Sequence, residues 1–389
     1  MNILVTSLPD LRKINPQRPH HLLRFLKQKH HITIISGNAW WVEPHEDDFT
    51  NALLKNTDYY YLSDGAISPL IQEALAFRRM NSLSVNLHDF DLVISFHSLI
   101  AGYTLSKKGT MPMVLDICDD IVDWISNSSQ IPSILKPAGK TAGSFFLKRA
   151  LNHSKKVTYS IESLKEKYRV PEEKSVLIPN GVDTQLFRRV SDDGLREALQ
   201  IPEGALVLGF VGYLGEWTNL EIVFETVRQL QRHMAVIMLV AGCGPKLEVY
   251  KSLVNELHIS DKVRFLGNIP YTRVPQYISS MDICLLPFDS SAVSTNALPL
   301  KLFEYMACEK PVISTPLTGV QRAVGDIPFY FADSEELKDQ LLNLYTYPEG
   351  CQKLGEKGRN FVESNFSWDN IGLAFTRVAN SALEEDNGR

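Results

Sequence analysis

Short apolar runs alternate with longer amphipathic segments along the chain, and this pattern restarts once. The apolar runs predict strands, and most of them end at a polar loop. They lie at residues 2–7, 31–36, 58–62, 92–96, 113–117, 157–161 and 176–178, and then at 206–211, 236–241, 263–266, 283–287, 312–314 and 329–331. Predicted helices lie between them, for example at 19–29, 71–80, 220–233 and 272–280. This alternation predicts an α/β fold with two doubly wound parallel sheets.

Two domains are expected from the repeated pattern and from the length of 389 residues. We place a first domain at residues 1–187, a second at 188–367 and a final helical segment at 368–389. The polar, charged segment 184–202 is the predicted connection. In doubly wound sheets, ligands bind beyond the carboxyl ends of the strands. Polar residues at those ends are therefore the first candidates for a functional site.

Residues 287–316 contain the most distinctive polar pattern. A predicted strand ends there, a Ser- and Thr-rich loop follows, and good helix formers begin at Leu300. A helix start presents free backbone amide groups to an anion. Lys301 lies in the first turn, where the helix dipole disfavours a cation and an anionic ligand would offset that effect. Glu304 follows one turn later on the same face. A cation beside a carboxylate suits a diphosphate that also carries a vicinal diol, as in a sugar nucleotide.

The string PLKLFEYMA at residues 299–307, followed by KPV at 310–312, resembles the donor-site signature of GT-B glycosyltransferases, especially those of family 4. Four further stretches resemble that family in the same order, namely IPNGVD at 178–183, FVGYLG at 210–215, VAGCGP at 240–245 and the run at 265–287. The first half resembles it mainly in its strand pattern and in RPHHLL at 18–23. The resemblance implies the GT-B fold, with two Rossmann-like domains that face a cleft and a last helix that crosses back to the first domain. It also implies transfer of a sugar from a nucleotide donor.

The resemblance further implies a set of donor-site residues. They are Gly212, Tyr213, Gly215, Asn268, Ile269, Asn296, Leu300, Lys301 and Glu304. The two glycines would let the backbone approach phosphates, or they serve an ordinary tight turn. Asn268 and Ile269 would contact the nucleobase through their backbone, and Glu304 would accept hydrogen bonds from ribose hydroxyl groups. The chain departs from the family at Tyr213, where arginine is usual, and at Asn296, where a carboxylate is frequent. Lys301 is therefore expected to supply more of the positive charge that binds phosphate.

Candidate bases for an acceptor hydroxyl follow two predicted strands of the first domain. One is His97, and the others are Asp116, Asp119 and Asp120. A transferase needs a group that accepts the proton of this hydroxyl or positions it. We predict Asp119 for the role, with the other three as alternatives, and helix capping or a loop position is an equally ordinary use of these side chains. A true base favours inverting transfer, whereas in retaining transfer Asp119 would position the acceptor.

The overall charge argues against general nucleic-acid binding, because the net charge is −5 and the isoelectric point is near 6.1. The five cysteines are scattered without a CxxC pair, which favours free thiols in a reducing compartment. The apolar start of the chain is typical of a first strand and lacks the basic region of a signal peptide. No apolar run has the length of a membrane span. We therefore expect a cytoplasmic protein.

A local charge pattern points to a membrane surface. Residues 126–161 contain no Asp or Glu, and an apolar triplet at 145–147 interrupts the stretch. Its basic residues are Lys136, Lys140, Lys148, Arg149, Lys155 and Lys156. Such a stretch either contacts an anionic membrane that holds a lipid-linked acceptor or forms a solvated basic surface. The first alternative places the protein at the inner face of the membrane.

No metal site is predicted, because Asp89 and Asp91 precede their strand and are interpreted as solvated turn residues. The nucleotide sugar is a substrate, so neither a cofactor nor a metal ion is expected. The predicted function is transfer of a sugar from a UDP- or GDP-sugar to a hydroxyl of a glycan or lipid-linked acceptor, in the synthesis of cell-surface polysaccharide or glycolipid. The alternatives are a sugar-nucleotide epimerase or phosphorylase and a non-catalytic nucleotide-sugar-binding subunit. Donor turnover with and without acceptor separates them.

Overall fold

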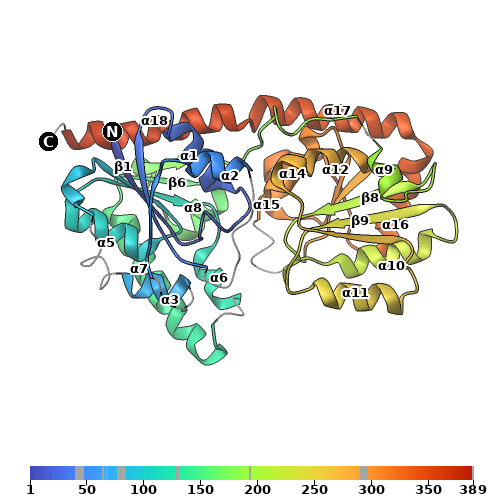
Figure 1. The fold of residues 1–389 in the computed structure, drawn as a ribbon, viewed down its shortest axis with the longest axis horizontal. Helices are drawn as coiled ribbons and strands as arrows, with labels where there is room; N and C mark the ends of the chain where they lie inside the picture. The colour runs from blue at the N-terminus through green and yellow to red at the C-terminus, as the bar shows by residue number, and fades with distance from the viewer. Residues whose placement is uncertain are drawn as a thin grey trace. The chain divides into compact units, whose positions relative to one another are not determined.

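The computed structural model describes residues 1–39, 48–63, 65, 67, 69–76, 85–127, 131–191, 194–289 and 297–387. The chain divides into two compact units (Figure 1). One unit comprises Met1–Asn180 together with Trp368–Arg389, and the other comprises Gly181–Ser367. No helix of the described residues is both long enough and apolar enough to cross a membrane.

The first unit contains a seven-stranded parallel sheet in the order β3-β2-β1-β4-β5-β6-β7. Its strands are β1 (Asn2–Ser7), β2 (His31–Ser36), β3 (Asp58–Tyr61), β4 (Leu92–Phe96), β5 (Met113–Ile117), β6 (Lys156–Tyr159) and β7 (Ser175–Leu177). Its helices are α1 (Arg18–Leu26), α2 (Asp48–Leu54), α3 (Pro69–Ala74), α5 (Leu99–Gly109), α6 (Ile121–Asn127), α7 (Lys136–His153), α8 (Glu162–Tyr168) and α18 (Trp368–Asn387). The strand order reverses between β1 and β4, the position at which doubly wound sheets bind ligands.

The second unit contains a six-stranded parallel sheet in the order β10-β9-β8-β11-β12-β13. Its strands are β8 (Leu206–Val211), β9 (Val236–Ala241), β10 (Val263–Gly267), β11 (Ile283–Leu286), β12 (Val312–Ser314) and β13 (Phe329–Tyr330). Its helices are α9 (Leu195–Ala198), α10 (Leu220–Leu230), α11 (Leu247–Glu256), α12 (Val274–Ser280), α14 (Leu300–Ala307), α15 (Thr318–Val324), α16 (Ser334–Thr346) and α17 (Pro348–Asn365). The two predicted doubly wound sheets are thus confirmed, and the order in this unit reverses between β8 and β11.

The last helix, α18, packs on the first unit although it follows the second in sequence (Figure 1). Trp368 stacks on His21 of α1 at a ring distance of 4.9 Å, and Phe375 lies 6.0 Å from Phe96 of β4. Gly372 permits this close approach, because a Cβ at that position would lie 2.0 Å from the ring of Phe25. The helix therefore completes the core of a sheet formed by the first half of the chain.

The boundary between the units lies at Asn180, whereas the sequence pattern predicts it at residue 187. The segment 181–187 belongs to the second unit because its backbone bonds there. The amide of Val182 donates to the Phe366 carbonyl at 2.8 Å, and Arg359 donates to the carbonyls of Thr184 and Phe187 at 3.0 and 2.6 Å. Residues 184–202 are consequently part of the second unit and do not form a free connection.

A buried ion pair fixes the carboxyl end of β5 in the first unit. Arg18 of α1 contacts both carboxylate oxygens of Asp116, at 2.9 and 2.7 Å, and the two side chains are 2% and 1% exposed. Thr158 donates to the same carboxylate at 2.6 Å, and Arg18 also donates to the Pro179 carbonyl at 2.8 Å. These bonds join α1, β5, β6 and the end of the first unit. Such a pair is sensitive to the loss of one partner, because the remaining charge stays buried.

Arg18→Met is expected to lower the free energy of unfolding by about 3–5 kcal/mol, because Asp116 keeps its buried charge without its partner. The matched control is Arg24→Met on the same helix, whose contact with the exposed Asp369 is 3.7 Å long. An exposed ion pair contributes only about 0–1 kcal/mol. Urea denaturation measures both values, and equal losses would contradict the structural role of Arg18.

Candidate functional site

The side chain of Lys301 lies over the carboxyl end of β8 in the second unit. It extends from the first turn of α14, and a Cβ on Gly212 would lie only 2.3 Å from its ammonium nitrogen. That nitrogen lies 4.1 Å from the ring centre of Phe210 and 5.2 Å from that of Phe288. Aromatic ring faces attract a cation, so these rings hold the ammonium group in place. The glycine at position 212 is required for this approach, and its φ of +137° also disfavours other residues.

Glu304 lies one turn after Lys301 and belongs to the same cluster. Both side chains are partly buried. Tyr271, at the start of η4 (Tyr271–Arg273), donates a hydrogen bond to the Glu304 carboxylate. The helix itself is anchored because the Tyr305 hydroxyl accepts a 2.8 Å bond from the Val211 amide at the end of β8. The positions of both charged groups are therefore set by contacts with β8 and with the segment after β10.

Burial shifts the pKa values of both charged groups toward neutrality. It lowers the pKa of Lys301 to about 7, and the nearby Glu304 carboxylate opposes this shift only partly. Burial raises the pKa of Glu304 to about 7, against the opposing effects of Lys301 and Tyr271. The free protein thus holds a cation and an anion that are poorly stabilised in their charged forms. A ligand with negative charge and hydroxyl donors would stabilise both.

The neighbouring loops bring backbone close to this cluster. A Cβ on Gly242 would lie 2.0 Å from the Gly212 carbonyl oxygen, so the loops after β8 and β9 are in direct contact. The Gly212 amide donates to Ala241 at 2.8 Å, and the Gly242 amide donates to Gly267 at 2.7 Å. The ends of β8, β9 and β10 therefore form one continuous backbone surface at the carboxyl edge of the sheet.

Most of the other predicted donor residues also lie at the carboxyl edge of the second sheet. Tyr213 is 54% exposed and lies 5.8 Å from the ring of Trp217, while Gly215 is buried beneath that tryptophan. Asn268 and Ile269 follow β10, and Asn268 is exposed. Asn296 lies outside the described residues. The structure thus brings Gly212, Lys301 and Glu304 into one cluster and leaves the nucleotide contacts of the others as predictions.

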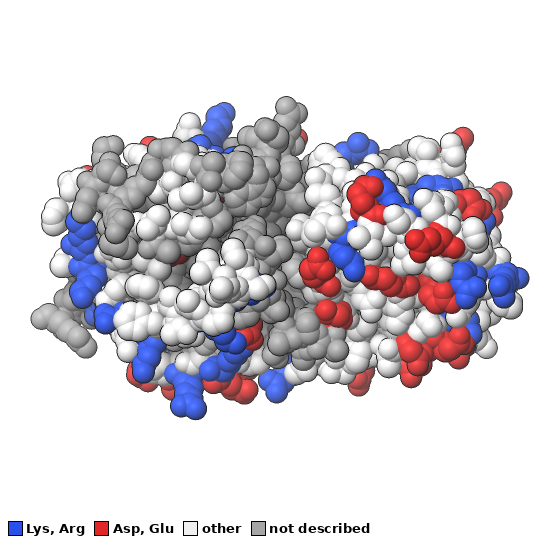
Figure 2. All heavy atoms as spheres, turned by 90° about the horizontal axis from the view of Figure 1, so that it is seen from below, with Lys and Arg blue, Asp and Glu red and all other residues white. Residues whose placement is uncertain are grey.

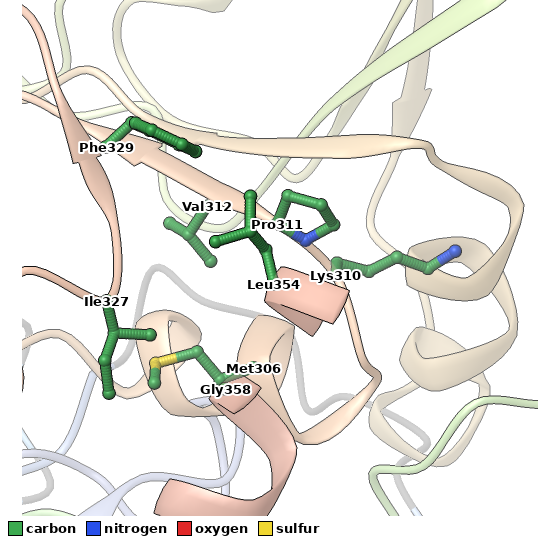
Figure 3. Close-up of a pocket in the computed structure, with 8 residues that line it drawn as sticks. All are labelled: Met306, Lys310, Pro311, Val312, Ile327, Phe329, Leu354 and Gly358. Atoms are coloured by element: carbon green, nitrogen blue, oxygen red, sulfur yellow. The ribbon is translucent and has the colours of Figure 1, made fainter. Parts of the chain in front are cut away.

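A separate hollow lies in the second unit (Figure 3). It is lined by Met306, Lys310, Pro311, Val312, Ile327, Phe329, Leu354 and Gly358. None of the predicted donor residues that the structure describes lines it. Lys310 donates to the carbonyls of Ser279 and Met281 at 2.8 and 2.6 Å. We therefore interpret this hollow as a packing feature between α14 and α17.

The candidate acceptor residues lie at the carboxyl edge of the first sheet. His97 follows β4 and has a left-handed backbone with φ of +55°. Its Nε2 atom lies 3.2 Å from the sulfur of Cys118, and that sulfur lies 3.7 Å from Oδ2 of the exposed Asp119. Burial raises the pKa of the Cys118 thiol, and the charges of Asp119 and Asp116 raise it further. Sequence analysis identified two members of this cluster and missed Cys118, since a single cysteine after a strand carries no spacing signal.

Two of the alternative bases are occupied by structural contacts. Asp116 is 1% exposed and bound to Arg18 and Thr158, so it supports the fold and is removed from the candidates. Asp120 accepts hydrogen bonds from the Tyr168 hydroxyl at 2.5 Å and from Lys167, which joins α6 to α8. Asp119 and His97 remain as candidates for the acceptor role, which stays a prediction.

Two doubly wound parallel-sheet domains with this arrangement define the GT-B class of glycosyltransferases, and structural comparison agrees. Sucrose-phosphate synthase from Thermosynechococcus elongatus superposes with a TM-score of 0.77 over 99% of this chain and 100% of that chain, at 18% identity. HepE from Anabaena, solved in complex with UDP-glucose, superposes with a TM-score of 0.75 over 98% and 100%, at 16% identity. At such low identity these structures establish the fold alone.

Sequence comparison finds a family match in the second unit. Residues 191–361 match the family described as glycosyl transferases group 1. A glycosyltransferase of Methanocaldococcus jannaschii is 22% identical over 291 residues, which cover 72% of each chain. Three other curated relatives are matched over 49% to 62% of their length. The second unit thus matches glycosyl transferases group 1, and the chain as a whole has the GT-B fold.

Binding of a nucleoside diphosphate is expected to be tightest near pH 7. The phosphates raise the pKa of Lys301 above its free value of about 7, so binding above that pH takes up a proton and weakens as the pH rises. Ribose hydroxyl groups lower the pKa of Glu304 below about 7, so binding below that pH releases a proton and weakens as the pH falls. Calorimetric titration with UDP and GDP, in two buffers of different ionisation enthalpy, measures both exchanges.

Two comparisons control this prediction. Pyrophosphate lacks ribose and should show only the weakening above pH 7. In Lys301→Met, binding should no longer weaken as the pH rises above 7. This variant should also bind diphosphate less tightly by roughly 1.5–3 kcal/mol, and its affinity for nucleoside should fall by less. Lys353→Met replaces an exposed lysine of α17 and should match the wild type. An unchanged pH profile in Lys301→Met would exclude this lysine from phosphate binding.

Proposed function

We propose that the protein transfers a sugar from a nucleoside diphosphate sugar, with uridine or guanosine as the nucleoside, to a hydroxyl group of a glycan or lipid-linked acceptor. The observation that carries the proposal is the Lys301–Glu304 cluster over the Gly212 backbone. A cation that burial has made easy to deprotonate gains stability from a diphosphate. The carboxylate beside it accepts hydrogen bonds from a vicinal diol. Sugar nucleotides contain both groups.

The second unit supplies what a departing diphosphate needs. Breaking the bond between the sugar and the diphosphate leaves negative charge on the phosphate oxygens, and positioned donors stabilise that charge. Lys301 neutralises part of it, and the free amides at the start of α14, near Leu300, add hydrogen bonds. HepE, which has the same fold, was solved with UDP-glucose, which supports this class of donor.

The first unit supplies the acceptor side of the reaction. The reacting carbon becomes oxocarbenium-like, and the acceptor oxygen attacks it as its proton leaves. The exposed carboxylate of Asp119 takes that proton, or positions the hydroxyl if the transfer is retaining. His97 lies in the same cluster and is the alternative. The bond from sugar to diphosphate breaks, the bond to the acceptor oxygen forms, and the nucleoside diphosphate is released.

Asp119→Asn is expected to reduce kcat by about 10²–10⁴ while the donor affinity stays near the wild-type value, because a base acts on the acceptor and not on the donor. A retaining enzyme should show a milder loss. Asp58→Asn, at the amino end of β3, replaces an exposed carboxylate away from the proposed site and is the control. The measurement is acceptor-dependent release of nucleoside diphosphate, with the anomeric configuration of the product read by NMR.

The outcomes of this experiment separate the alternatives. Near-normal turnover in Asp119→Asn, together with an inactive His97→Ala, would move the acceptor role to His97. Donor turnover without any acceptor would favour an epimerase or a phosphorylase over a transferase. Tight nucleotide binding without turnover of any donor would overturn the catalytic proposal.

We also propose that the first unit contacts an anionic membrane where a lipid-linked acceptor is held. In the basic stretch 126–161, Ile134 and Leu135 of η2 (Ser133–Leu135) are 86% and 55% exposed, and Phe145 of α7 is 52% exposed. Lys148 and Arg149 are exposed on the same helix, and Arg149 lies 4.6 Å from the Phe145 ring. Figure 2 shows uncharged side chains on the first unit, with basic side chains and some acidic ones beside them. Exposed apolar side chains beside cations favour a lipid interface.

Lys148→Gln with Arg149→Gln is expected to weaken binding to anionic vesicles at least about tenfold, because each cation near such a surface contributes about 1 kcal/mol. Ile134→Ser should weaken it further by removing an apolar contact. The control is Lys251→Gln on α11, where Lys251 is paired with Glu248 in the second unit. Sedimentation with phosphatidylglycerol vesicles at low and high salt measures the effect. Absence of wild-type binding at low salt would remove the proposal.

A further inference from the structure

The carboxyl edge of the first sheet brings three potential metal ligands together. His97 follows β4, and Cys118 and Asp119 follow the adjacent β5. The sulfur of Cys118 lies 3.2 Å from Nε2 of His97 and 3.7 Å from Oδ2 of Asp119. All three ligand atoms lie within 4.8 Å of one another. This is a convergent set of one imidazole, one thiol and one carboxylate.

Two of the three separations are close to those between ligand atoms of a tetrahedral zinc ion. Zinc binds sulfur at about 2.3 Å and nitrogen or oxygen at about 2.0–2.2 Å, which places neighbouring ligand atoms roughly 3.3–3.7 Å apart. The two separations from the cysteine sulfur are close to that interval. Three protein ligands leave a fourth position for water, and the exposed Asp119 shows that solvent reaches this side of the cluster.

The backbone that carries the ligands is held in place by other contacts. His97 has a left-handed backbone conformation, which histidine adopts more often than most non-glycine residues. The helix after it is fixed at its start, because Glu73 accepts bonds from the amides of Ile100 and Ala101 at 2.6 and 3.0 Å. After the neighbouring strand β6, the Ser160 hydroxyl donates to the Cys118 carbonyl at 2.7 Å and holds the segment that follows β5. The ligands therefore need little rearrangement to converge on an ion.

We propose that His97, Cys118 and Asp119 bind a thiophilic divalent cation, with zinc as the best match. Thiolate and imidazole ligands favour zinc over magnesium or manganese, which prefer oxygen. Binding replaces the proton of the Cys118 thiol by the metal and releases that proton to solvent. The ion also coordinates the Asp119 carboxylate, which then cannot accept the proton of an acceptor hydroxyl. Zinc is therefore expected to inhibit transfer, a consequence that rests on the proposed acceptor role of Asp119, whereas the binding itself does not.

Cobalt titration of the reduced full-length protein tests the site directly, because a cobalt–thiolate bond has a near-ultraviolet charge-transfer band. We expect one cobalt per chain, displacement by zinc and no displacement by magnesium. Cys118→Ser should lose the band and weaken zinc binding at least about 100-fold, and His97→Gln should also weaken it. Cys243→Ser removes an exposed cysteine of the second unit and should behave as wild type. Thermal melting of each variant confirms that it is folded.

Activity provides a second, separable readout. Zinc should inhibit transfer by the wild type, and Cys118→Ser should lose that inhibition, measured for each protein as the ratio of its rates with and without zinc. A cobalt band that persists in Cys118→Ser, or disappears in Cys243→Ser, would overturn the site. So would the absence of stoichiometric binding in the wild type. Zinc binding that is weakened in Asp119→Asn but does not inhibit the wild type would overturn the inhibitory consequence and the base role of Asp119, and would leave the donor-site proposal untouched.

Discussion

Parallel pairing of the strands within each sheet is the constraint on which both candidate sites depend. Parallel strands end at the same edge, so residues far apart in sequence meet there. In the first unit the register pairs Phe96 with Asp116, which places the loops that carry His97 and Asp119 next to each other. In the second unit the ends of β8 and β9 are level, and Gly212 and Gly242 allow their loops to touch. The candidate site residues of each unit are thus concentrated at one edge of its sheet.

A fully buried pair of charges and a partly buried pair in this protein differ in how their desolvation is offset. Arg18 and Asp116 are bound through two short hydrogen bonds, which offset much of the desolvation penalty within the folded chain. Lys301 and Glu304 lie on one helix face, and burial shifts both pKa values to about 7. Their desolvation is not offset by the fold alone. A ligand with complementary charge would supply the missing stabilisation, which is why the second pair indicates a binding site and the first a structural one.

Much of this architecture was predictable, and the errors have specific causes. Strands 2–7, 92–96, 113–117, 206–211 and 236–241 agree with the structure residue for residue, because buried strands of parallel sheets are continuous apolar runs. The domain boundary at residue 187 was misplaced, since Val182 and Phe187 bond with residues near position 360 that no local pattern reveals. Asp116 was a candidate base because it lies at a strand end, yet its partner Arg18 is 98 residues away in sequence.

The sequence by itself determined the fold class and selected the candidate donor segment, because periodicity and the order of short motifs are local properties of the chain. Lys301 and Glu304 could be selected from helical spacing alone. Only the tertiary structure decided which polar groups are available for chemistry. It paired Asp116 with Arg18, placed Lys301 against Gly212 and Phe210, and added Cys118 to His97 and Asp119. Burial and long-range contact set the charge state of a side chain, and neither is encoded in the residues beside it in sequence.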